Sequence, residues 1–177
     1  IQTENLAVAR KYFTLLKKTY NIDVDICIRN HIHTGKSRTY ILDVADDYAA
    51  RKILSSVKFM NGDGEIEEDY AIVHLMILRK ACCKRAFLRG AFLCAGSISE
   101  PEKTYHFEIV CMTPERAQQI CDMMKTFNID GKCITRKKYH VVYIKEASQI
   151  VDMLNVMEAH VSLMELENIR ILKEMRN

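Results

Sequence analysis

The chain has 177 residues, of which 49% are hydrophobic and 28% charged, as is ordinary for a soluble globular protein of one domain or two small halves. The net charge of +3 is too small to indicate nucleic-acid binding by itself. No apolar run reaches the ~18 residues of a membrane span, and no signal peptide pattern opens the chain. The seven cysteines are odd in number and lack paired metal-ligand spacing, so we interpret them as reduced thiols of a cytosolic protein.

The first half of the chain predicts a helix, a β-hairpin, a second helix and an acidic linker. In chain order these elements are expected at residues 3–20, 24–29 with 39–44, 46–57 and 61–69. Thr3 is expected to cap the first helix, because a threonine hydroxyl accepts a hydrogen bond from a free backbone N–H.

An apolar stretch rich in small residues follows, with the sequence LRGAFLCAG at 88–96. It predicts a helix over 84–96. A glycine inside a helix costs about 1 kcal/mol relative to alanine, so Gly90 indicates a tightly packed neighbour. Gly96 is expected to end the helix in the left-handed conformation. The residues expected to pack this helix are Leu88, Gly90, Ala91, Ala95 and Gly96.

The remaining elements repeat the order of the first half. They are expected as strands at 97–99 and 105–111, a helix starting at 113–115, a hairpin at 132–137 with 139–144, a helix through 150–157 and a last helix from 162 to 177. The start at 113–115 is well defined, because it combines a threonine cap, a proline and an acidic residue.

The chain also contains an internal duplication. KTYNID at 18–23 returns as KTFNID at 125–130, a shift of 107 residues, and both copies end a helix and precede a hairpin. The same shift places a first copy of the small-residue helix before residue 1. We therefore expect the first such helix to be missing from the chain, with Ile1 and Gln2 as the remnant of the strand that follows it.

The stretch 88–96 resembles the LAGLIDADG motif of homing endonucleases. Leu88 takes the first leucine of that motif, Gly90 its first glycine and Gly96 its last glycine. In that family two such helices pack together in a pseudo-two-fold αββαββα pair, and the penultimate acidic residue of each motif holds a catalytic metal. Ala95 stands at that position. The resemblance therefore implies no catalytic residue, no metal and no cofactor in this chain.

The runs 79–110 and 167–177 resemble the WhiA family of bacterial regulators, and with the duplication this resemblance covers nearly the whole chain. It implies an α+β, LAGLIDADG homing-endonuclease-like fold. Two pseudo-symmetric αββ repeats would place their helices on one face of a curved antiparallel sheet. We expect the first repeat and linker at 1–78, the second repeat at 79–161, and at 162–177 the start of a helix leading to a helix-turn-helix domain absent from the chain.

The resemblance implies the N-terminal domain of a non-catalytic DNA-binding transcription regulator linked to sporulation, cell division and chromosome segregation. The expected location is the cytoplasm, in association with the nucleoid. The expected partners are DNA, mainly through the helix-turn-helix domain, and other proteins, but no membrane. Two alternatives stay open: an active LAGLIDADG homing endonuclease or maturase, and a protein-interaction scaffold that does not bind DNA.

Basic side chains gather on both predicted hairpins. In LAGLIDADG proteins these hairpins form a concave saddle that lies in the major groove, where basic side chains would neutralise phosphates. The candidate DNA-binding residues are Arg29, Lys36, Arg38, Arg136, Lys137 and Lys138. A solvated sheet face is the alternative interpretation.

Three further groups of residues receive structural interpretations. His31 and His33 could reach one metal from the same side of a strand, but no third ligand lies nearby and we interpret them as part of a solvated loop. Cys82 and Cys83 are adjacent, which disfavours a disulfide between them. The acidic residues of 63–69 are interpreted as a solvated linker rather than a cation site.

Overall fold

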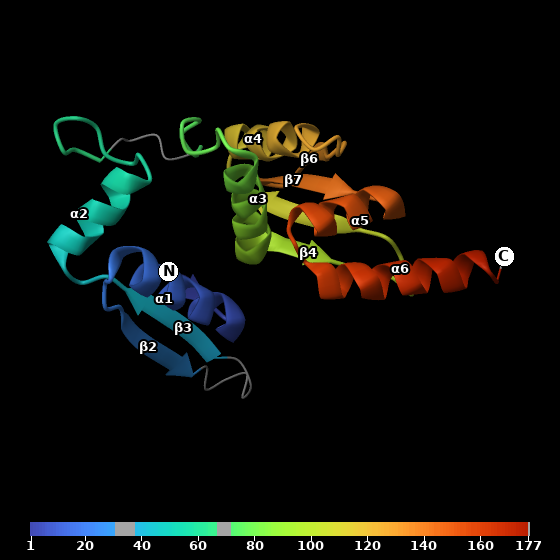
Figure 1. Cartoon of the computed structure of the whole chain (residues 1–177), viewed down its shortest axis with the longest axis horizontal. Helices are drawn as coiled ribbons and strands as arrows, with labels where there is room; N and C mark the ends of the chain where they lie inside the picture. Colours follow the sequence, from blue (N-terminus) through green and yellow to red (C-terminus); the bar gives the residue numbers. More distant parts are fainter. Residues whose placement is uncertain (31–37, 67–71, 177) are drawn as a thin grey trace. The chain divides into compact units, whose positions relative to one another are not determined.

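The structure is a computed structural model that describes residues 1–30, 38–66 and 72–176 (Figure 1). By its internal contacts the chain divides into two units, Ile1–Tyr70 and Ala71–Asn177, and each unit is described by itself. No helix within the described ranges combines the length and the apolar character needed to cross a membrane.

The first unit packs helices against an antiparallel three-stranded sheet. Its elements are β1 (Gln2–Thr3), α1 (Leu6–Tyr20), β2 (Asp25–Asn30), β3 (Arg38–Asp43) and α2 (Asp47–Ser56), and the strand order is β1-β3-β2. Leu42 of β3 is 2% exposed and packs with Ala9 and Leu16 of α1, so α1 covers one face of this sheet.

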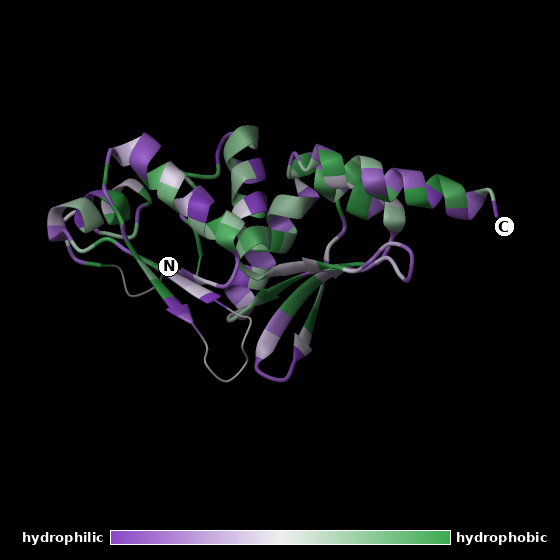
Figure 2. Cartoon of the chain, turned by 90° about the horizontal axis from the view of Figure 1, so that it is seen from below, coloured by the Kyte–Doolittle hydropathy of each residue, from purple (hydrophilic) through white to green (hydrophobic). Residues whose placement is uncertain are grey.

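The second unit contains an antiparallel four-stranded sheet with the strand order β4-β5-β7-β6. Its elements are α3 (Ala81–Ala95), β4 (Gly96–Ile98), β5 (Phe107–Cys111), α4 (Pro114–Lys125), β6 (Lys132–Arg136), β7 (Tyr139–Ile144), α5 (Ala147–Val156) and α6 (His160–Glu174). Phe107 and Ile109 of β5 pack with Ile120 of α4 in its core. Polar and apolar bands alternate along α6, which leads to the C label in Figure 2.

The predicted duplication is confirmed by topology and by backbone conformation. The order strand, helix, strand, strand, helix is followed by β1 to α2 and again by β5 to α5. Asn21 and Asn128 have φ angles of 54° and 61°, which asparagine tolerates better than most residues. Lys58 and Glu158 after the closing helices have φ angles of 61° and 59°. The repeated NID sequence therefore encodes a left-handed turn that leads from a helix into a hairpin.

The strand pairing refines the alignment of the two copies. Asp25 pairs with Asp43, and the residue 107 positions after Asp25, Lys132, pairs with Tyr143. The shift thus changes from 107 residues in β2 to 100 in β3, so the first hairpin is seven residues longer. β1 pairs with β3 as β5 pairs with β7. Gln2 is therefore part of the counterpart of β5. The prediction that Ile1 and Gln2 belong to the strand directly after the motif helix is wrong.

The predicted cap of α1 is wrong, whereas Gly96 ends α3 as predicted but not in the predicted conformation. Asn5, rather than Thr3, caps α1: its side chain accepts hydrogen bonds from the N–H groups of Ala7 at 2.9 Å and Val8 at 3.4 Å. Thr3 instead pairs with β3, because the chain is still extended there.

Gly96 follows α3 with a φ of −92°, which is extended and not left-handed. A Cβ at Gly96 would lie 2.7 Å from the Phe92 carbonyl oxygen, and the Phe92 ring stacks on Phe107 with 4.9 Å between centroids. Glycine is therefore needed here for close approach and not for its φ.

The described strands form two sheets, one in each unit, and not the single curved sheet that we expected, because every described ladder joins strands of the same unit. The last helix begins at His160, slightly before the predicted start at 162. Leu78, which the sequence placed with the first repeat and linker, packs in the core of the second unit.

Candidate nucleic-acid interface

The sheet of the second unit has one face toward the helices and one face away from them. Side chains alternate along a strand, and residues directly opposite on neighbouring strands share a face. Because Phe107, Ile109 and Val142 lie in the core with α4, their strand neighbours lie on the other side, which we call the open face. The open face consists of Ser97, Glu108, Val110, Lys132, Ile134, Arg136, Tyr139, Val141 and Tyr143.

Basic side chains and aromatic rings alternate on the open face. Lys132 lies directly opposite Tyr143, and Arg136 lies opposite Tyr139. Lysines at the two ends of β7 lie over these rings. The Nζ of Lys138 is 5.3 Å from the centroid of the Tyr139 ring, and the Nζ of Lys145 is 5.4 Å from that of Tyr143. These contacts hold the stems of the lysines against the sheet.

The carboxylate of Glu108 lies on the same face, next to Arg136. His106 Nε2 is 3.0 Å from one of its oxygens, Ser97 Oγ donates to the other at 3.4 Å, and Arg136 Nη1 is 3.8 Å away. The hydrogen bond with His106 is the main cause that lowers the pKa of Glu108, against the opposing effect of its burial. Glu108 is therefore ionised at neutral pH and offsets part of the positive charge of this face.

The predicted residues of the second hairpin lie together. Arg136 ends β6 with its side chain 61% exposed on the open face. Lys137 and Lys138 form the turn to β7, and Lys137 has a φ of 56°. The structure thus places three cations at one tip of the second sheet.

The predicted residues of the first hairpin do not form one patch. Arg38 lies on the same face of β3 as Tyr40 and Leu42, which pack in the core with α1. Arg29 lies opposite Thr39, on the other face of the sheet. Because strand side chains alternate, Arg29 and Arg38 lie on opposite faces of the first sheet, and their assignment to DNA binding stays a prediction. Lys36 lies outside the described residues, as do His31 and His33, for which the sequence predicts a solvated loop.

The motif helix α3 has a buried side and an open side. Leu88 is completely buried in the core of its own unit, whereas a Cβ built at Gly90 would meet no described heavy atom within 4 Å. A groove of about 430 Å³ runs along the open side. Its α3 lining is Phe87, Gly90, Ala91, Cys94 and Ala95. The methyl group of Ala95 supplies no metal ligand, and the described residues contain no group of three or more His, Cys, Asp or Glu able to hold a metal.

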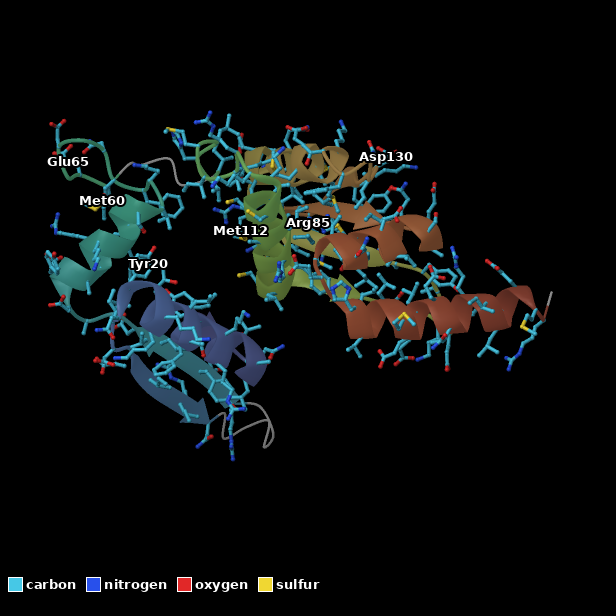
Figure 3. The ribbon with its side chains drawn as sticks, in the orientation of Figure 1. Tyr20, Met60, Glu65, Arg85, Met112 and Asp130 are labelled. Carbon is cyan, nitrogen blue, oxygen red and sulfur yellow. The ribbon has the colours of Figure 1, made fainter. Side chains whose placement is uncertain are left out.

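Two arginines that fix α3 were not predicted. Arg85, labelled in Figure 3, donates from Nη1 to the carbonyl oxygens of Asn155 and Val156, each at 3.4 Å. Its guanidinium also lies 5.2 Å from the Phe127 ring centroid. Arg89 forms an ion pair with Glu158 at 3.1 Å. Arg85 thus binds the C-terminal end of α5, where free carbonyls favour cations, and Arg89 binds the carboxylate of a residue just after that helix.

Solved structures define the class of fold. I-DmoI in complex with DNA and Mn matches with a TM-score of 0.59 over 89% of this chain and 78% of that chain, at 11% identity. Full-length WhiA from Thermatoga maritima matches with a TM-score of 0.69 over 98% of this chain and 52% of that chain, at 20% identity. At these identities the likeness shows the fold alone, which is LAGLIDADG homing-endonuclease-like, with helices and antiparallel sheets as the sequence predicted.

The sequence comparisons define the family. The model of the WhiA LAGLIDADG-like domain matches residues 84–176, and that of the WhiA N-terminal LAGLIDADG-like domain matches 1–60. The probable cell division protein WhiA of Lachnoclostridium phytofermentans is 52% identical over 177 residues, and that of Alkaliphilus oremlandii is 43% identical. The chain belongs to the WhiA family. Both matches cover 100% of this chain but only 56% and 55% of the relatives' own lengths. The chain therefore spans about half of the length of these relatives.

Proposed function

We propose that this chain is the LAGLIDADG-like part of a non-catalytic, DNA-binding transcription regulator that acts in cell division. The observation that carries the proposal is the open face of the second unit, where Lys132, Arg136 and Lys138 lie beside tyrosine rings. The names of the curated relatives support a role in cell division. Roles in sporulation and chromosome segregation, association with the nucleoid and a DNA-binding helix-turn-helix domain are proposed for the whole protein on the family resemblance.

The open face is suited to phosphates more than to base edges. Its described cations are one arginine and several lysines. Lysine acts as a point charge and lacks the fixed bidentate geometry with which arginine binds guanine. Glu108 lies within 3.8 Å of Arg136 and repels phosphate, so it weakens the attraction. We therefore expect weak binding by this unit, with little sequence preference and strong dependence on salt.

The proposal assigns no catalytic role to the motif helix. Cleavage of a phosphodiester by divalent metals needs carboxylates that hold the ions and lower the pKa of a bound water. Ala95 neither binds a hard cation nor accepts a proton, and Leu93, the other position where the motif has an acidic residue, is also apolar. We expect no cleavage of duplex DNA with Mg²⁺ or Mn²⁺. Nicking by the purified chain that EDTA abolishes and that persists through repurification would restore the endonuclease alternative.

A salt titration tests DNA binding. Fluorescence anisotropy with a labelled duplex between about 50 and 200 mM salt gives the slope of log K against log salt, which is ~0.9 per phosphate contact. The double variant Arg136→Ala, Lys138→Ala should lower this slope by about 1–2 and weaken binding equally across sequences.

Lys125→Ala provides the control, because this exposed lysine ends α4 on the other side of the sheet. It should leave the slope unchanged. Equal affinity of the double variant and the unmodified chain at every salt concentration would favour the protein-interaction scaffold over the DNA-binding regulator.

A further inference from the structure

The strand β2 forms an edge of the first sheet. Its described pairing is with β3 on one side only, so its other row of backbone N–H and C=O groups faces no described strand. Proteins commonly protect such an edge with proline, lysine or a covering segment, because an open edge pairs readily with another strand. The sequence of β2, DICIRN, has neither proline nor lysine, and Ile26 and Ile28 are 53% and 54% exposed.

The residues of β2 are complementary to a second copy of the same strand. Asp25, Cys27 and Arg29 lie on the face away from α1, and Ile26 and Ile28 lie on the face toward it. If two copies of β2 pair antiparallel with Cys27 opposite Cys27, Asp25 lies opposite Arg29 and Ile26 lies opposite Ile28, each twice. Opposite charges and branched apolar residues both stabilise such cross-strand positions.

We propose that a second copy of this chain occupies the β2 edge, forming a two-fold symmetric dimer through antiparallel β2–β2 pairing. The pairing joins two three-stranded sheets into one sheet of six strands. It also closes a groove of about 420 Å³ between α1 and the edge, which is lined by Leu6, Phe13, Ile26 and Ile28 among others. The isologous arrangement is closed, so it stops at two copies and does not propagate.

The corresponding edge of the second unit shows that the fold does not require this complementarity. β6 is the edge strand there, and Lys132 and Arg136 occupy the positions of Asp25 and Arg29. In the same self-pairing register Lys132 would face Arg136, and like charges directly opposite are destabilising. Cys133 and Thr135 occupy the positions of Ile26 and Ile28, so β6 also lacks the two branched apolar residues of β2. Self-pairing is therefore favoured at β2 and disfavoured at β6.

The dimer does not depend on the proposed function, because the cations that carry that proposal, Lys132, Arg136 and Lys138, lie on β6 and the turn after it. One pair of short strands buries less surface than the ~1,200 Å² typical of stable interfaces, so we expect micromolar self-association. Sedimentation equilibrium of the purified chain over a wide concentration range measures this association. A chain that remains monomeric at the highest concentration, about 0.5 mM, would overturn the proposal.

A charge exchange tests the register. Asp25→Arg places two arginines opposite each other, and Arg29→Asp places two aspartates opposite each other, so each variant alone should raise the dimer Kd at least tenfold. An equimolar mixture should associate as a heterodimer, because each strand then faces opposite charges. The double variant Asp25→Arg, Arg29→Asp should also recover the homodimer. Lys11→Asp, an equally large charge change at an exposed site on α1, should leave the Kd unchanged.

Oxidative cross-linking tests which edge forms the contact. Opposite Cα atoms in an antiparallel pair lie about 4.5–5.5 Å apart, which a disulfide can span. Cys27 is exposed, so a mild thiol oxidant should join two chains through this residue. The covalent dimer should disappear in Cys27→Ser and persist in Cys133→Ser, the exposed cysteine on β6. Failure of the mixed charge variants to associate, or a covalent dimer that persists in Cys27→Ser, would refute the β2 edge as the interface.

Discussion

Gln119 joins α4 to the segment before α3. It is 7% exposed, its Nε2 donates to the Val73 carbonyl oxygen at 2.6 Å, and its Oε1 accepts from the Val73 N–H at 2.9 Å. One side chain thus satisfies both backbone groups of Val73. The variant Gln119→Leu keeps a side chain of similar size and removes both hydrogen bonds, which isolates their contribution to the free energy of unfolding.

The expected loss follows from the groups that remain unpaired. Each hydrogen bond contributes about 0.5–1.5 kcal/mol net, and a buried backbone group without a partner costs about 1–3 kcal/mol. Val73 is only partly buried, so water recovers part of this cost. We expect Gln119→Leu to lower the free energy of unfolding of the second unit by about 2–4 kcal/mol, which corresponds to a Tm lower by about 9–18 °C for a unit of this size.

Urea unfolding followed by far-UV circular dichroism measures this loss, since the chain has no tryptophan for fluorescence. Gln118→Leu is the matched control, because Gln118 is exposed and its Nε2 donates to Asp122 at 2.8 Å on the surface of the same helix. It should change stability by less than about 0.5–1 kcal/mol. If Gln119→Leu is no less stable than Gln118→Leu, the pairing with Val73 does not hold this segment.

Gln119→Glu adds a test by pH. A protonated carboxyl group can both donate to the Val73 carbonyl and accept from its N–H, whereas the ionised form cannot donate. The folded state therefore raises the pKa of the introduced carboxyl group above its unfolded value of ~4.3. Its stabilisation should be present below the unfolded pKa and lost as pH rises through the folded pKa. A defect of the same size at pH 4 and pH 7 would contradict this reasoning.

Five further variants test local features by the same unfolding assay. Gly96→Ala should destabilise by about 1–3 kcal/mol, because its Cβ would overlap Phe92. Gly90→Ala should be neutral or stabilising by up to ~1 kcal/mol, because its Cβ enters open space. Equal effects of the two substitutions on stability would refute this distinction. Asn128→Ala should cost about 1–2 kcal/mol at its φ of 61°, and Asn128→Gly should cost less. Because His106 lowers the pKa of Glu108, the contribution of Glu108 is present above the unfolded pKa and lost as pH falls through the folded one. Glu108→Gln should therefore flatten acid unfolding, and an unchanged pH profile would refute this role.

The fold could be predicted from the sequence because its signals are local and repeated. Apolar periodicity gave the hairpins and helices, and the recurrence of KTYNID as KTFNID gave the two-copy topology. The extended state of Thr3 and the conformation of Gly96 were not predictable, because each depends on a partner: pairing of Thr3 with β3, and the ring of Phe92 over Gly96. The contacts of Arg85 depend on the end of a helix 70 residues away.

The candidate site was predictable only in part, because residue type does not give the face of a strand. Arg29 and Arg38 are both basic residues of one hairpin, yet they lie on opposite faces of its sheet. Charge alone assigns both arginines to one basic surface, whereas the alternation of side chains along a strand assigns them to opposite faces. The buried Gln119 left no pattern in the sequence, since its partner is the backbone of Val73, whose hydrogen bonds do not depend on residue type.

The two copies have diverged most clearly in the charge of their outer sheet faces. Arg29 and Arg136 are equivalent, but two residues of opposite charge, Asp25 and Lys132, occupy the other end of the same strand in the two copies. Asp25 also lies directly opposite Asp43, which places two carboxylates together on the face of the first sheet. These carboxylates repel phosphate along the face that carries Arg29. Arg136 also has a carboxylate, Glu108, at 3.8 Å, but Lys132 lies on the same strand and Lys137 and Lys138 follow in the turn. Arg136→Ala should therefore weaken DNA binding more than Arg29→Ala in the anisotropy assay, and the reverse order would show that the interface lies on the first unit.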